Sequence, residues 1–108
     1  MRLLALLPVL LPVFAAHANA GDPGFARETV RLVRQDCGSC HGMSLQGGLG
    51  TPLTREALTG QSAEALAIII LHGKHGTAMP PWKSLVSEQQ AHWIAERLLE
   101  GFPEEGAP

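Results

Sequence analysis

The chain has 108 residues, of which 17% are charged, and its formal net charge is −2, so a single domain is expected. Its eight Lys and Arg residues are scattered, which excludes a nucleic-acid-binding protein because such proteins cluster positive charge. Only 5% of the residues are aromatic and none is Tyr, so a chain this short has little with which to build a core. We therefore expect an additional stabilising group, such as a disulfide or a metal.

The first twenty residues have the pattern of a secretory signal peptide. Arg2 precedes an apolar stretch over 3–14, and Ala18-Asn19-Ala20 has the small-x-small pattern of a cleavage site. A membrane anchor is the alternative, but this stretch is shorter than the roughly 20 residues that cross a bilayer, and prolines interrupt it. We expect cleavage after Ala20, which leaves one domain over 21–108 that is exported to the periplasm and does not span the membrane.

The first predicted helix covers 23–36, with Asp22 as N-cap and Pro23 at the first helical position. We expect the arginines of this helix, including Arg34, to lie mostly outside. Its apolar stripe consists of Phe25, Thr29, Leu32 and Val33. A Gly-rich loop follows over 42–52, and a short helix is predicted over 55–58 with Thr54 as its cap.

The next predicted helix begins after Ser62 and ends near His72, with Gly73 just beyond its end. Its run of isoleucines is also compatible with a strand, but the cap, the alanines and the closing glycine favour a helix. The segment 73–82 contains consecutive prolines and is predicted to be a loop.

Ser87 opens the last predicted helix, with Gln90 as the second half of a capping box and Gly101 as the stop. The buried stripe of this helix is predicted to be Ala91, Ile94, Ala95 and Leu98. The mature chain is therefore expected to be all-α, with about four helices joined by two unusual loops.

One motif carries chemistry: Cys37-Gly38-Ser39-Cys40-His41 has the Cys-x-x-Cys-His pattern of c-type haem attachment. Thiols at this spacing can each form a thioether with one haem vinyl group, and the adjacent His41 can ligate the iron. The porphyrin also supplies the apolar area that the small core lacks. The sequence thus predicts one haem c, attached covalently through Cys37 and Cys40.

Three other interpretations of the motif compete with haem attachment. A structural disulfide leaves His41 unexplained, and a thioredoxin-like redox pair needs a βαβ context that is not visible here. A zinc site would take Cys37 and Cys40 together with His72 and His75, but only two residues separate these histidines, fewer than is usual.

The second iron ligand is predicted to be Met79, which lies in a loop constrained by Gly and Pro between two helices. A thioether is neutral and soft, so it favours reduced iron and raises the potential. His72 and His75 remain alternatives that would lower the potential, and core packing is the ordinary role of a lone Met. Met43 is too close to His41 in sequence to reach the opposite side of a haem.

The haem motif, the Gly-rich loop with Pro52, and Gly76-Thr77-Ala78-Met79-Pro80 together resemble the class I cytochromes c. The resemblance covers about 25–99 and implies an all-α fold wrapped around one haem. It also implies that His41 and Met79 are the axial ligands and that the Pro52 carbonyl accepts the Nδ1 proton of His41. The first and last helices would cross near Trp93, although no matching glycine precedes Cys37. Trp82 would pack on the haem edge, or else serve as a plain core residue.

More closely, the segment 36–54 and the Gly-Thr-Ala-Met-Pro-Pro-Trp loop resemble the cytochrome c-55X family, which is encoded with the haem-d1 nitrite reductase of denitrifying bacteria. The resemblance implies a monomeric periplasmic carrier of single electrons that serves this reductase or its haem-d1 maturation, with a quinol-linked or other cytochrome as donor. Contact with such partners would use an apolar patch at the haem edge, made of Met43, Leu45, Ala78 and Pro80.

The sequence contains no nucleophile–base pair, so no enzyme activity is predicted. An alternative function is a haem protein whose distal ligand leaves the iron, as in a gas sensor or a peroxidase-like enzyme. A thiol or zinc protein is the remaining alternative.

Overall fold

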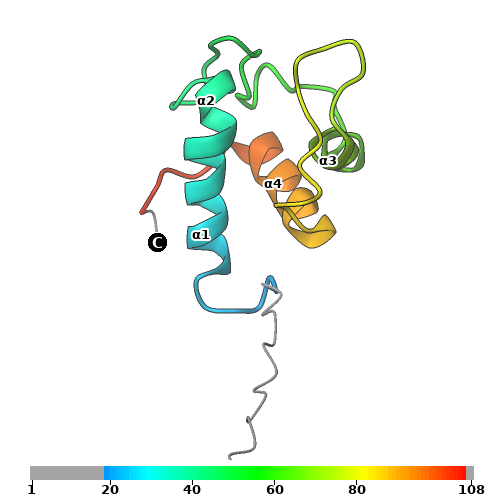
Figure 1. Cartoon of the computed structure of the whole chain (residues 1–108). Helices are drawn as coiled ribbons and strands as arrows, with labels where there is room; N and C mark the ends of the chain where they lie inside the picture. The colour runs from blue at the N-terminus through cyan, green and yellow to red at the C-terminus, as the bar shows by residue number, and fades with distance from the viewer. Residues whose placement is uncertain (1–18, 107–108) are drawn as a thin grey trace, which may run out of the picture.

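The computed structural model describes residues 19–106, which form an all-α domain (Figure 1). The elements are α1 (Phe25–Leu32), a π-helical turn η1 (Val33–Cys37), α2 (Gly38–His41), α3 (Ala63–His72) and α4 (Glu88–Glu100). The expected fold class is confirmed. No helix among these residues is long and apolar enough to cross a membrane. The predicted signal peptide lies almost wholly outside the described residues.

The first three elements form one continuous helix that carries the haem motif at its C-terminal end. It begins at Phe25 with Gly24 as N-cap, where φ is 93°, a value that favours glycine. The prediction of Asp22 as N-cap was wrong. The Asp22 carbonyl accepts from the Phe25 N–H at 3.1 Å and its carboxylate accepts from the Asn19 N–H at 2.8 Å, so Asp22 closes the preceding turn instead.

The π turn η1 was not predicted. Its signature is the N–H of Gly38, which donates to the carbonyl of Val33, five residues earlier. A π turn holds one residue more than an α turn, so the residues after it are rotated by about 100° around the helix axis. Arg34 lies in this turn and is buried, with 6% of its surface exposed. The prediction that it lies mostly outside was wrong.

The predicted ends of α3 and α4 are confirmed. Ser62 Oγ accepts from the Ala65 N–H at 3.1 Å, and Ser87 and Gln90 form a full capping box. The short helix predicted over 55–58 is instead a turn. Thr54 Oγ1 accepts from the Ala57 N–H at 3.2 Å as a cap would, but Gly60 at a φ of 87° ends the segment before a second turn forms.

The core lies where α3 and α4 pack against each other, and Val33 of η1 is part of it. The buried stripe predicted for α4 is confirmed, and its members join residues from η1, α3 and the loops: Val33, Leu45, Leu58, Leu66, Ala67, Ile70, Leu71, Val86, Ala91, Ile94, Ala95 and Leu98. Trp93 links α1 to α4, because its ring meets Phe25 edge-on at 5.8 Å between ring centroids. The first and last helices therefore meet through aromatic side chains.

Candidate haem site

The two thiols of the motif lie at the C-terminal end of the long helix. Cys37 ends η1 and is half-buried, whereas Cys40 is exposed in α2, and neither forms a disulfide. Residues three apart in a helix lie on the same side, so both sulfurs face one direction. Ser39 Oγ donates to the Asp36 carbonyl at 2.7 Å, which turns the small residue between the cysteines back onto the helix.

Burial and, second to it, the nearby carboxylate of Asp36 together raise the pKa of the Cys37 thiol to about 11. A thiol–disulfide enzyme needs the opposite, because a lowered pKa makes the reactive thiolate available. The thiol alternative is therefore disfavoured. The zinc alternative also finds no support, because residues 19–106 contain no group of three or more His, Cys, Asp and Glu side chains that could hold a metal.

The ring of His41 is held by one short contact: Nδ1 lies 2.6 Å from the carbonyl oxygen of Thr51. A carbonyl can only accept, so Nδ1 donates, and the neutral imidazole then carries its free lone pair on Nε2, where it can bind a metal. The resemblance had assigned this role to Pro52, and that assignment was wrong by one residue. The ring of Pro52 faces Gly47 instead, where an added Cβ would lie 3.2 Å from Pro52 Cγ.

The Gly-rich loop reaches this position by close backbone approach. The N–H of Gly50 donates to the Cys40 carbonyl at 2.7 Å. A Cβ on Gly50 would lie 2.8 Å from Nδ1 of His41, closer than real side chains come. A Cβ on Gly48 would lie 2.8 Å from the carbonyl oxygen of Cys40. The loop therefore lies directly against the His41 ring because it lacks side chains at these positions.

The loop that carries Met79 is closed by its own backbone. The N–H of Lys74 donates to the Met79 carbonyl at 3.3 Å, and Thr77 Oγ1 donates to the Lys74 carbonyl at 2.6 Å. The chain turns at Gly73, where φ is 74°. A Cβ at this position would lie 2.8 Å from the Met79 carbonyl oxygen, so the turn requires glycine. The Met79 side chain is half-buried, whereas His72 and His75 are exposed. This favours Met79 as the second ligand.

Two further predictions concern the surroundings. Trp82 is half-buried against the core, and its backbone N–H donates to the Ile70 carbonyl at 3.0 Å; its contact with a haem stays a prediction. The apolar patch needs correction, because Leu45 is 2% exposed and lies in the core with a φ of 61°. Its N–H donates to the Gly42 carbonyl, which turns the side chain inward. Met43 remains on the surface, 62% exposed.

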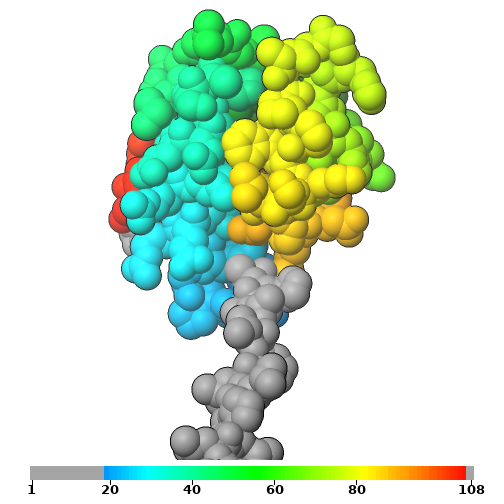
Figure 2. Space-filling model, in the orientation of Figure 1, coloured from blue at the N-terminus to red at the C-terminus, as the bar shows by residue number. Residues whose placement is uncertain are grey.

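The helix end with the thiols and the loop with Met79 come from opposite halves of the chain. Figure 2 shows the cyan-to-green part, which includes η1 and α2, beside the yellow part, which includes the loop after α3, with a seam between them on one face. The donors fit haem c: two free thiols at the attachment spacing, an imidazole with Nε2 available, and a thioether in a rigid loop.

Comparisons with known proteins show which family the chain belongs to. The family model described as cytochrome C oxidase, cbb3-type, subunit III, matches residues 24–96. The chain is 52% identical over 98 residues to cytochrome c55X of Paracoccus denitrificans, covering 89% of this chain and 95% of that protein. The chain belongs to the c-type cytochromes, in the c55X family. The cytochrome is thus an electron-transfer protein, and the family implies haem c bound covalently through Cys.

Two solved structures extend the likeness. The c-type cytochrome NirC matches with a TM-score of 0.70 and 47% identity, covering 73% of this chain and 93% of that one. Dihydro-heme d1 dehydrogenase NirN in complex with DHE matches with a TM-score of 0.62 and 30% identity, covering 71% of the cytochrome but 16% of that larger chain. The cytochrome therefore resembles one part of the dehydrogenase.

Proposed function

We propose that the cytochrome is a periplasmic single-electron carrier that holds one haem c through Cys37 and Cys40, with His41 and Met79 as axial ligands. Its electrons serve the haem-d1 nitrite reductase or the maturation of haem d1. The observation that carries the proposal is the 2.6 Å contact between His41 Nδ1 and the carbonyl oxygen of Thr51. His41 directly follows Cys40 in the sequence, and Cys37 and Cys40 are both free thiols. Haem c supplies a reversible one-electron couple when bound.

The residues of the chain have separate tasks in this proposal. Thr51 holds the proton on His41 Nδ1, which keeps Nε2 available and makes the imidazole a stronger donor. Met79 offers a neutral sulfur from a loop whose backbone is tied to α3, where the Lys83 N–H donates to the Leu71 carbonyl at 3.2 Å. If His41 and Met79 both bound the iron, no position would stay open for a small molecule, and this would separate a carrier from a gas sensor or peroxidase-like enzyme.

Similarity supports the denitrification role. NirC matches over nearly its whole length, and dihydro-heme d1 dehydrogenase of Pseudomonas aeruginosa is 34% identical over 106 residues. A chain that resembles the cytochrome part of that enzyme is suited to exchange electrons with the same system. The exposed Met43, Ala78 and Pro80 offer a small apolar edge for brief docking, and the signal peptide predicted over 1–20 provides export.

The ligand set is tested on the protein exported from a host with a c-type maturation system. Intact mass should show residues 21–108 plus one haem. The ferric protein should have a near-infrared sulfur–iron band, which Met79→Ala abolishes and the exposed control Met43→Ala keeps. A mass without added haem contradicts the proposal. Carbon monoxide that shifts the ferrous bands of the native protein at neutral pH would instead favour the gas-sensor alternative.

The partner is tested by stopped-flow mixing of the reduced cytochrome with oxidised haem-d1 nitrite reductase, and of the oxidised cytochrome with dihydro-heme d1 dehydrogenase and its substrate. Electron supply predicts rapid, saturable oxidation in the first experiment. A maturation role predicts rapid reduction in the second. Rates no faster than those with mitochondrial cytochrome c in both experiments would contradict the denitrification role.

A further inference from the structure

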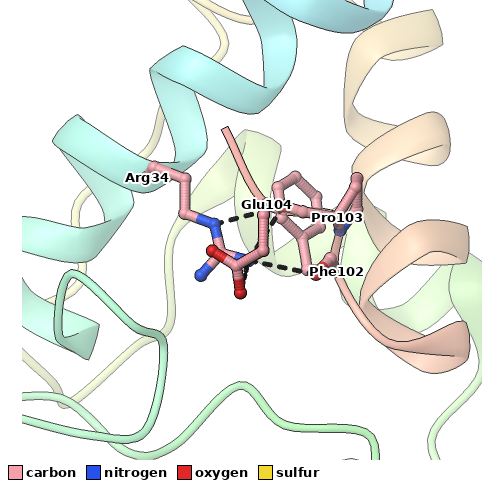
Figure 3. A network of polar contacts seen from close by, with 4 residues as sticks. All are labelled: Arg34, Phe102, Pro103 and Glu104. Carbon is pink, nitrogen blue, oxygen red and sulfur yellow. Dashed lines mark hydrogen bonds and ion pairs between the residues drawn. The ribbon is translucent and has the colours of Figure 1, made fainter. Parts of the chain in front are cut away.

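A buried arginine lies one helical turn before the first haem-attachment thiol. Arg34 Nη2 donates to the carbonyls of Phe102 at 3.0 Å and Pro103 at 2.8 Å, and Nε donates to Pro103 at 3.2 Å (Figure 3). Its guanidinium also lies over the Phe102 ring, 5.6 Å from the centroid. The C-terminal segment therefore wraps the arginine with carbonyl oxygens and an aromatic ring.

The charge of Arg34 is only weakly neutralised. Within residues 19–106 its one ion pair is with Glu104 at 3.5 Å, and the Glu104 side chain is 86% exposed, so water screens that carboxylate. The carbonyl dipoles satisfy the N–H donors but carry no net charge. The ring of Phe102 is in turn held edge-on by Trp93 at 6.3 Å between centroids. The fold thus keeps a full positive charge at a fixed position away from bulk water.

That position adjoins both haem-site segments. Arg34 and Cys37 belong to the same π turn, Val33–Cys37. Arg34 also lines an open cavity of about 380 Å³ together with Leu45 and Leu53, which belong to the segment after His41. The charged residues Arg55, Glu56 and Glu100 line the same cavity. The Leu53 N–H donates to the Leu45 carbonyl at 2.9 Å, so this wall of the cavity is rigid. The charge therefore belongs to a residue of the turn that ends at Cys37, and it shares a cavity with the segment that follows His41.

We propose that Arg34 sets the reduction potential of the cytochrome: its buried positive charge, held by the carbonyls of the C-terminal segment 102–104, favours the reduced state. This rests on the proposed function. Oxidation adds one positive charge at the iron, and a nearby cation opposes that addition. In a region of low effective dielectric the interaction is strong and is little screened by salt.

The test compares charge with hydrogen bonding at one position. Arg34→Gln removes the charge, and Arg34→Lys keeps it while losing the forked donors. Both variants should unfold at lower denaturant concentration than the native holoprotein. Only Arg34→Gln should lower the potential measured by spectroelectrochemistry, and the shift should persist in 0.5 M NaCl. A merely structural role predicts equal potentials for both variants, or equal shifts in both, and either result overturns the proposal.

Matched controls separate burial from charge alone. Arg31→Gln makes the same charge change at an exposed position of the same helix, so any shift should be small and should vanish in high salt. If Arg34→Gln fails to assemble, Glu104→Gln should raise the potential at low salt more than Glu105→Gln does. Equal shifts from these two variants would overturn the proposal. A wild-type protein without covalent haem would instead defeat the proposed function itself.

Discussion

Adding one methyl group at Gly50 should disturb the haem site more than its size suggests. The added Cβ would lie 2.8 Å from Nδ1 and 2.9 Å from Cε1 of His41, whereas ordinary contacts begin at 3.4 Å. Ring and loop must therefore separate by roughly 0.6 Å, which stretches the 2.6 Å contact to Thr51 to the limit of a hydrogen bond.

The cost has two parts. A weakened hydrogen bond costs about 1 kcal/mol, and the overpacking costs about 1 kcal/mol or more. Gly50→Ala should therefore destabilise the holoprotein by about 2 kcal/mol, or roughly 30-fold in the unfolding equilibrium. Because His41 also becomes a weaker donor when Nδ1 loses its partner, the reduction potential should rise.

Guanidinium unfolding followed at the Soret band measures the first effect, and spectroelectrochemistry measures the second. Gly60→Ala is the control: its φ of 87° makes alanine strained, but no atom lies within 4 Å of the added Cβ. The control should lose stability and keep the native potential. If Gly50→Ala leaves the potential unchanged, the contact between His41 and Thr51 does not govern ligand strength and the reasoning fails.

Three further experiments test the fold. Cys37→Ser/Cys40→Ser should leave the chain largely unfolded, because the core is small without the porphyrin; native helix content and cooperative melting by circular dichroism would contradict this. Ser87→Ala should cost about 1 kcal/mol in denaturant unfolding through the lost capping box, and the exposed control Ser84→Ala should cost almost nothing; equal costs would refute the cap. Ile94→Ala should cost about 2–5 kcal/mol and Ile94→Val about 0.5–1.5 kcal/mol in the same assay, because Ile94 is 2% exposed; a cost below 1 kcal/mol for alanine would show a looser core.

The sequence predicted what depends on neighbours within one turn of chain. Ser62 and the Ser87–Gln90 pair cap their helices because each cap bond joins residues three apart. Gly73 and Gly101 end the helices because their positive φ angles suit glycine. The haem motif is also local, since thioether spacing is a property of five consecutive residues.

Features set by distant segments were beyond such reasoning. Arg34 is buried because carbonyls 68 and 69 residues later accept hydrogen bonds from its guanidinium. No sequence pattern near Arg34 predicts these partners. The π turn was likewise not indicated by any local pattern in the sequence. The carbonyl that accepts from His41 Nδ1 is that of Thr51 because Gly50 lies directly against the imidazole ring. This close approach is a property of the three-dimensional structure and not of the local sequence.

The closure of the Met79 loop has a consequence for how such cytochromes diversify. Its hydrogen bonds run largely through main-chain atoms, from Lys74 to Met79 and from Trp82 and Lys83 back to the end of α3. The side chains of Lys74, His75 and Ala78 point outward and are exposed, so they are not needed to hold the sulfur in place. Substitution at these positions should change which redox protein the cytochrome binds while its visible spectrum stays unaltered. These positions are therefore a starting point for engineering electron transfer to new partners.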